Sequence, residues 1–266
     1  MLKSLTNIFR VQELRSRILY TVLAILIYRI GSHIPTPGID PTALLGFLSS
    51  AQGGGGLLTI MDLFSGGALF RFSILALGIM PYISASIIMQ LLGVVIPALE
   101  RMQKEGESGR KKINQYVRYL TLVLCIIQSA AMASWIQSIN EGAMIYMNPG
   151  LGFVLIVVAT ATAGTMFLMW LGDQITERGL GNGISVIIFA GIVARIPAGV
   201  YDMFQKRDSE YLNSLVIVLF FIIFAIVIFC VVYEESGQRR IPVQYAKRVV
   251  GRKVFGAQST HIPFKI

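Results

Sequence analysis

Residues 57–97 read LLTIMDLFSGGALFRFSILALGIMPYISASIIMQLLGVVIP and are the most informative part of the chain. Its first part, 57–70, is apolar but too short to cross a bilayer, whereas 72–96 is close to the roughly 20 residues that span a hydrocarbon core. A helix that breaks at membrane depth leaves backbone groups unsatisfied, which is tolerated only beside protein or a water-filled cavity. The stretch therefore predicts a re-entrant half-helix beside a pore or a substrate site. The alternative is that residues 57–70 rest on the outer surface, which would leave a large apolar face in water.

The chain as a whole is too apolar for a soluble globule. Of its 266 residues, 55% are hydrophobic and 14% charged, and the mean hydropathy is +0.68. A bilayer would solvate such a composition directly. We therefore expect an all-α polytopic membrane protein with six spans, at about 18–34, 72–96, 119–139, 150–172, 183–204 and 212–233. The run of small residues at 159–165 in the fourth span favours close helix packing.

The basic residues are sorted by loop. Of the 23 lysines and arginines, 17 fall in residues 1–17, 97–115 and 235–266 or just after Gly172, whereas the alternate loops hold only Lys206 and Arg207. Cytoplasmic loops carry such an excess, so both termini are expected in the cytoplasm. Residues 1–17 also have amphipathic helical spacing, which suits either a helix in the headgroup region or a simple basic flank.

Two helical stripes mix apolar and polar side chains. The first consists of Ile79, Ile83, Ser86 and Gln90, and the second of Ile184, Ile188, Gly191 and Arg195. An arginine in line with isoleucines is costly if it faces lipid, so we expect the second stripe to face protein or water. The alternative is an Arg195 side chain that extends to the outer headgroups.

No constellation typical of an enzyme or a metal site is found in the sequence. The glycines at 179, 181 and 183 follow a membrane helix rather than a strand, which argues against a dinucleotide site. His33 and His261 are expected at opposite membrane faces, and Cys125 and Cys230 lie inside spans. We therefore expect neither catalysis, metal nor cofactor. The competing classes are a secondary transporter, although no paired intramembrane acids are visible, and a membrane hydrolase, which would need a nucleophile and a base within reach.

Residues 237–266 form a basic tail in which Val, Tyr and Phe alternate with charges, a pattern typical of a β-hairpin. Such a surface suits anionic lipid, RNA or an acidic protein, and composition does not choose among them. It can also be a solvated cytoplasmic loop.

Several long strings together resemble the SecY family of bacterial protein-conducting channel subunits. They are YRIGSHIPTPGI (28–39), LFSGGALFRFSILALGIMPYISASIIMQLL (63–92), KEGESGRKKINQYVRY (104–119), GDQITERGLGNGIS (172–185) and GQRRIPVQYAKRVVGRKVFGAQSTHIP (237–263). The resemblance covers nearly the whole chain and implies its N-terminal part, about six of ten spans. Residues 18–204 would form the first five-helix half, 205–234 the sixth helix, and 235–266 a cytoplasmic loop toward a missing seventh span.

The resemblance also implies site residues for a SecY-like helical bundle with a half-helix plug. The pore ring would take Ile79, Ile83, Ile184 and Ile188. The plug, at about 57–70, would take Ile60, Leu63, Phe64, Ser65, Gly66, Gly67 and Leu69. The lateral gate would take Ser84, Ile87, Ile88 and Gln128. The surface that docks cytoplasmic partners would consist of Arg239, Arg240, Lys247, Arg248, Arg252 and Lys253.

The function implied is that of the central subunit of the translocation channel in the bacterial plasma (inner) membrane. It would conduct unfolded secretory polypeptides across that membrane and release membrane-protein helices sideways into it. The implied partners are the SecE and SecG subunits, the SecA ATPase, the ribosome, signal sequences, nascent polypeptides and anionic lipids.

Overall fold

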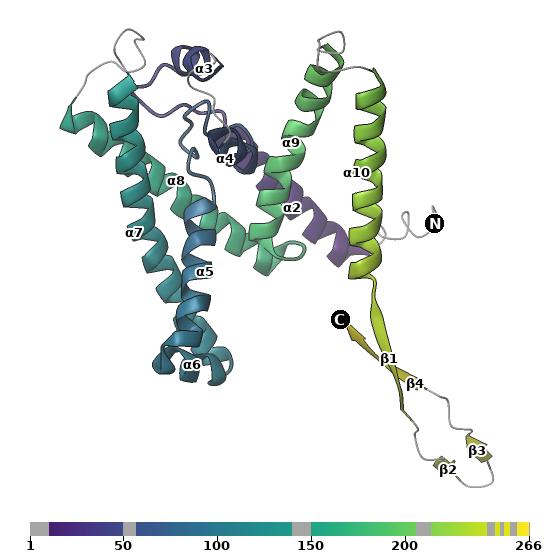
Figure 1. The fold of residues 1–266 in the computed structure, drawn as a ribbon. Helices are drawn as coiled ribbons and strands as arrows, with labels where there is room; N and C mark the ends of the chain where they lie inside the picture. The colour runs from purple at the N-terminus through teal and green to yellow at the C-terminus, as the bar shows by residue number, and fades with distance from the viewer. Residues whose placement is uncertain are drawn as a thin grey trace. The chain divides into compact units, whose positions relative to one another are not determined.

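The computed structural model describes residues 11–49, 57–139, 150–205, 214–243, 248–250, 253–255 and 260–265. The chain divides into two compact units, Met1–Pro197 and Ala198–Ile266. The first unit holds most of the helices, and the second holds helix α10 and the β-strands (Figure 1).

Helices of the first unit form over the apolar runs of the sequence. Within this unit α7 packs along both α5 and α8, and α2 packs against α8 (Figure 1). Helix α9 begins in the first unit and crosses the boundary at Pro197. The bounds are α2 Gln12–Gly31, α3 Pro41–Ser49, α4 Leu57–Ser65, α5 Met80–Val95, α6 Pro97–Lys104, α7 Glu107–Ile139, α8 Leu151–Arg178 and α9 Gly183–Gln205.

The second predicted span is shorter than expected, because residues 66–79 are not helical. The segment contains glycines at 66, 67 and 78 with positive φ, and Phe72 also has a positive φ of 44°. These conformations are incompatible with a right-handed helix. The segment instead pairs with residues 34–36, since Thr36 N donates to Phe72 O and Ile74 N donates to Ile34 O, both at 2.9 Å. Helix α5 therefore begins only at Met80, with Pro81 in its first turn.

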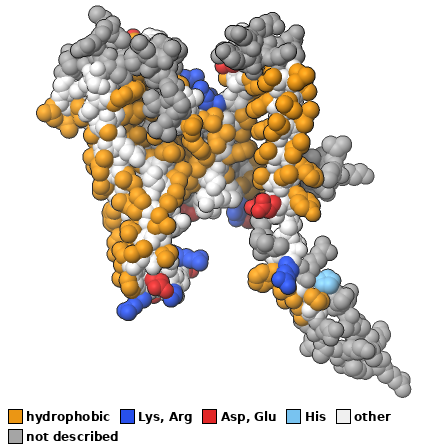
Figure 2. Space-filling view, in the orientation of Figure 1, with side chains coloured by type: hydrophobic (Ala, Val, Ile, Leu, Met, Phe, Trp, Pro, Cys, Tyr) orange, Lys and Arg blue, Asp and Glu red, His pale blue; other side chains and the backbone are white. Residues whose placement is uncertain are grey.

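Four described helices, α7, α8, α9 and α10, are long and apolar enough to cross a membrane. A fifth crossing is possible if α5 and α6, which meet at a bend of 102°, count as one broken span. Helix α2 does not qualify, because every 18-residue stretch of it contains at least three charged residues from among Glu13, Arg15, Arg17 and Arg29. In the first unit, hydrophobic side chains cover the outer faces of α5 and α7, and charged side chains gather at the α6 end (Figure 2).

The second unit confirms the predicted hairpin in the basic tail. Helix α10, Ser214–Glu235, is followed by β1, Gln238–Val243, which pairs antiparallel with β4, Thr260–Lys265. The shorter strands β2, Arg248–Val250, and β3, Lys253–Phe255, form a second antiparallel two-stranded sheet.

Candidate functional site

Helix α4 ends where two glycines allow the chain to reverse. Gly66 and Gly67 have φ values of 68° and 90°, which L-residues with side chains rarely adopt. The carbonyl groups freed at this end are bonded to α2. Tyr28 OH donates to Ser65 O at 3.0 Å, and Arg29 Nη1 donates to Gly66 O at 2.9 Å. The C-terminal end of α4 is therefore held by two side chains of α2.

The same end of α4 lies directly on α9. A Cβ atom added at Gly66 would be 3.0 Å from Gly191 Cα, and one added at Gly191 would be 3.0 Å from Phe64 O. Backbone thus meets backbone, an approach that requires glycine on both sides. The surface formed by Tyr28, Arg29, Gly191 and Arg195 is called the α4 seat hereafter.

A buried ion pair joins α4 to the α4 seat. Asp62 is fully buried, and its Oδ2 contacts the guanidinium of Arg195. Its Oδ1 accepts a hydrogen bond from Phe70 N at 2.9 Å, while Ser65 Oγ donates to Asp62 O at 3.0 Å. The Arg195 guanidinium also lies 5.9 Å from the centre of the Phe70 ring. The inward interpretation of Arg195 thus agrees with this geometry.

The four isoleucines of the two stripes are brought together in one apolar cluster. Ile79, at the start of α5, is buried in it, and Ile83, Ile184 and Ile188 pack against it half-buried. The α8–α9 turn fixes the two α9 members. Gly183 N donates to Thr176 Oγ1 at 2.8 Å, and Gly172 leaves room for Ile184. These four residues are called the isoleucine quartet.

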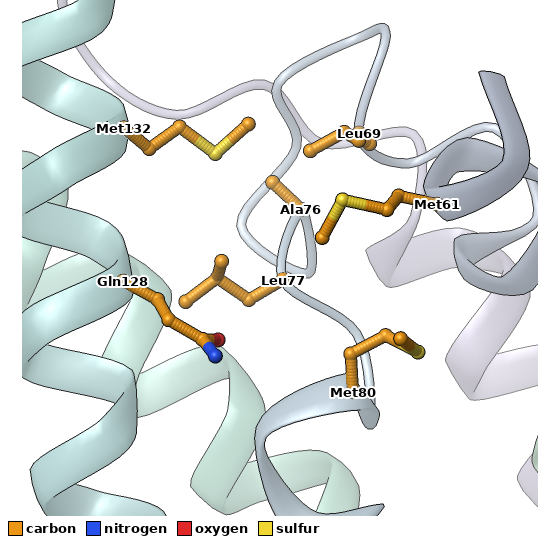
Figure 3. A pocket seen from close by; sticks show the side chains of 7 residues that line it. All are labelled: Met61, Leu69, Ala76, Leu77, Met80, Gln128 and Met132. Atoms are coloured by element: carbon orange, nitrogen blue, oxygen red, sulfur yellow. The ribbon is translucent and has the colours of Figure 1, made fainter. Parts of the chain in front are cut away.

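The residues predicted for the plug divide into two faces. Ser65, Gly66, Gly67 and Leu69 are buried, whereas Ile60, Leu63 and Phe64 are exposed. A small cavity of about 30 Å³ lies between this segment and α7. In Figure 3, Gln128 and Met132 reach into it from α7, and Met61, Leu69 and Met80 lie across from them.

The four residues predicted for a lateral gate are not gathered at one point. Gln128 lines the small cavity, and Ser84 is half-buried on α5. Ile87 and Ile88 are exposed, and Ile88 lines a separate cavity of about 550 Å³ between α5, α6 and α7. Their shared role stays a prediction.

Four of the six basic residues predicted for docking lie on the β-strands of the second unit, which together are called the basic ribbon hereafter. Arg239 and Arg240 are neighbours in β1, Arg248 is in β2, and Lys253 is in β3. Lys247 and Arg252 lie outside the described residues.

Sequence reasoning missed Asp62, although a signal was present. It is the only acidic residue in 57–97, and Arg195 is an isolated base in the fifth apolar run. Ionisable residues within apolar segments usually pair with one another, so the two could have been matched. Within the described ranges, no group of three His, Cys, Asp or Glu side chains is placed to hold a metal ion.

These observations define a class, a multi-pass helical membrane protein in which a short re-entrant helix is seated against a long one beside an apolar cluster. Comparison with known proteins gives the family. A family model described as SecY matches residues 73–266, and the chain belongs to the SecY family. The predicted fold class is thereby confirmed.

Curated relatives named "Protein translocase subunit SecY" match nearly the whole chain. The relative from Buchnera aphidicola subsp. Acyrthosiphon kondoi is 53% identical over 96% of this chain and 71% of its own length. That of Escherichia coli (strain K12) is 52% identical over 96% of this chain and 57% of its own length, and that of Aquifex aeolicus (strain VF5) is 47% identical over 98% and 61%. The chain thus spans 57–71% of the length of these relatives.

Solved structures share the fold at low sequence identity. "The structure of a protein conducting channel" matches with a TM-score of 0.62 and 20% identity over 94% of this chain and 52% of that one. "Sec61 in the Canine ribosome-channel complex from the endoplasmic reticulum" matches with a TM-score of 0.58 and 19% identity over 86% and 49%. A structure whose title describes the plug domain of the SecY protein matches with a TM-score of 0.59 and 21% identity over 94% and 52%.

Proposed function

We propose that this chain forms the larger part of the central subunit of a protein translocation channel. The observation that carries the proposal is that α4 is fixed on α9 beside the isoleucine quartet. A short helix held by glycine contacts, the hydrogen bonds from Tyr28 and Arg29, and one ion pair is suited to leave and return. The full-length channel comprises this chain together with the part of the family fold that it does not contain.

The isoleucine quartet supplies one side of the pore ring in this proposal, and α4 is the plug. A channel for unfolded chains must accept side chains of any chemistry yet stop ions at rest, and narrow apolar constrictions do so by excluding water. Opening displaces α4 and separates the quartet. A signal sequence and a docked partner favour the open state only as far as they bind it more tightly than the closed one. No chemical step occurs in the subunit itself.

The lateral gate of this channel includes the exposed face of α5 and the facing side of α7, with Ser84, Ile87, Ile88 and Gln128. Support comes from the exposure of Ile87 and Ile88, which lets an apolar signal sequence or a nascent membrane helix pack against α5. The half-buried amide of Gln128 supplies a polar contact at the edge of the small cavity.

The basic ribbon is the docking surface for cytoplasmic partners, the SecA ATPase and the ribosome. A cationic two-stranded projection attracts acidic protein or RNA surfaces. SecE, SecG and anionic lipids are the other partners. The N-terminus lies in the cytoplasm, because the basic residues of the loops fall on one side. The membrane is the bacterial plasma (inner) membrane, which the bacterial origin of the matched SecY relatives supports.

The test is reconstitution of the full-length channel with SecE, SecG and SecA in proteoliposomes. With ATP, a signal-bearing preprotein should become protected from external protease, and a preprotein without its signal sequence should not. Signal-independent protection, or no protection together with saturable uptake of a small solute, would contradict the proposal. The second outcome would favour a transporter.

A further inference from the structure

We propose that Asp62 and Arg195 form an ion-pair latch, which keeps α4 on its seat in the closed channel and must break before α4 can leave. The inference rests on the proposed function and names the contact that regulates it. Asp62 is on α4 and Arg195 on α9, so the pair joins the element that moves to the element that holds it.

The buried environment of the Asp62 carboxylate makes loss of the ion pair costly. Asp62 Oδ1 accepts from Phe70 N, and among the described residues Oδ2 contacts the Arg195 guanidinium and no other donor. The Asp62 side chain is 0% exposed and that of Arg195 is 35% exposed. Loss of the arginine therefore leaves a buried charge without its counter-ion, which is far more costly than loss of a surface pair. Release of α4 into water solvates both groups.

None of the other ion pairs in the described part of the chain contains a buried charge. In each of them both side chains are at least 37% exposed, and three join residues one helical turn apart. The bonds from Tyr28 and Arg29 to α4 end on backbone carbonyls. Among the ion pairs of the described residues, Asp62–Arg195 is thus the one that joins α4 to α9.

Helix α9 couples the latch to the isoleucine quartet. Ile184, Ile188, Gly191 and Arg195 follow one another at spacings of four, three and four residues, so they share one face of α9. A displacement of α9 that draws Ile184 and Ile188 away from α5 also draws Gly191 and Arg195 away from α4. Widening of the constriction and release of the plug would therefore accompany each other.

The test compares Arg195→Gln, Asp62→Asn and the double variant in the full-length channel. The matched control is Arg118→Gln, which breaks the 2.7 Å pair with Asp173 between α7 and α8, away from α4. Two measurements are made without signal sequence or partner, the resting ion conductance in planar bilayers and the amide hydrogen exchange of segment 57–71.

We expect Arg195→Gln to raise both the resting ion conductance and the amide exchange rate of segment 57–71 by at least about tenfold, because it leaves the buried Asp62 carboxylate without a counter-ion. In both measurements the double variant should lie closer to the unaltered channel than Arg195→Gln does. The neutral asparagine side chain that replaces Asp62 still accepts a hydrogen bond from Phe70 N, and no buried charge remains. Arg118→Gln should change neither measurement.

The latch is refuted if Arg195→Gln behaves like Arg118→Gln in both measurements, or if the double variant is no closer to the unaltered channel than Arg195→Gln. If Arg195→Gln does not accumulate in the membrane, the isosteric Asp62→Asn decides. A severalfold rise in exchange supports the latch, and an unchanged rate refutes it. The proposed function is judged separately, by transit of a signal-bearing preprotein through the unaltered channel.

Discussion

Gly164 on α8 lies directly against the carbonyl oxygen of Ile74, in the non-helical segment that precedes α5. A Cβ atom added at Gly164 would overlap that oxygen and contact Leu75 Cδ2 at 3.3 Å. Helix α8 therefore supports the segment through an approach that only glycine permits. Leu75, fully buried behind this contact, belongs to the same apolar cluster as Ile79.

Replacement of Gly164 by Ala should destabilise the protein. The new methyl group must displace the backbone at Ile74, and overpacking of this kind costs about 1–3 kcal/mol. The measurement is the thermal unfolding midpoint in detergent. Gly152→Ala, on the same helix with nothing within 4 Å of the added Cβ, is the matched control and should leave the midpoint unchanged or slightly raised. Equal midpoints for the two variants would contradict the prediction.

Polar replacement in the isoleucine quartet should raise the resting ion leak of the full-length channel. Ile83→Asn or Ile188→Asn places an amide where the proposed constriction must exclude water, so a wetted pathway becomes more favourable. Single-channel recording without partner or substrate measures the leak. Ile83→Leu keeps the site apolar and should stay near the unaltered level. A leak that does not distinguish Asn from Leu would count against this role.

Charge reversal in the basic ribbon should weaken docking. We expect Arg252→Glu with Lys253→Glu to raise the Kd for SecA or the ribosome by about tenfold, which corresponds to about 1.4 kcal/mol. Binding to proteoliposomes at several salt concentrations measures this, since the loss should shrink as salt screens the surface. Lys111→Glu with Lys112→Glu, on an exposed turn of α7, changes the net charge equally and is the matched control. An equal loss in that control would show that the ribbon has no special role.

Acid should loosen the start of α3. Asp40 Oδ1 accepts from Thr42 Oγ1 at 2.6 Å and from Thr42 N at 2.8 Å, and these bonds hold the pKa of its carboxyl below the ordinary 3.8. A carboxyl with a lowered folded-state pKa stabilises the fold above its unfolded pKa and loses that effect as pH falls through the folded value. Amide exchange of residues 42–44, corrected for intrinsic rates, should therefore change little from pH 7 to 5 and rise below about 3.8. Asp40→Ala should be faster at pH 7 and lose the pH dependence, and parallel profiles for the two proteins would refute the prediction.

Local patterns in the sequence predicted much of this fold. The apolar runs located the helices, the small residues around Gly164 indicated a close contact, and the alternation in the tail indicated a hairpin. Helical periodicity also grouped Ile79 with Ile83 and Ile184 with Ile188, before the structure placed all four in one cluster. These features depend on residues near one another in the chain, which a sequence displays directly.

What the sequence did not predict depends on contacts between distant segments. Residues 66–79 are apolar enough for a helix, yet the positive φ of Phe72 and the pairing with residues 34–36 are set by tertiary packing. Asp62 and Arg195 are 133 positions apart, so no local pattern links them. The lateral-gate residues come from two different spans, and the structure places Gln128 beside the small cavity but Ile88 beside a separate one.

The pairing of Phe72 and Ile74 with residues 34–36 has a mechanical consequence. It anchors the chain at Phe72, so the six residues 66–71 form the whole free tether on the C-terminal side of α4. A fully extended chain covers about 3.3–3.6 Å per residue, which gives this tether a reach of about 20 Å. While α5 stays in place, the C-terminal end of α4 must therefore remain within about 20 Å of Phe72, about two-thirds of the thickness of a hydrocarbon core roughly 30 Å thick.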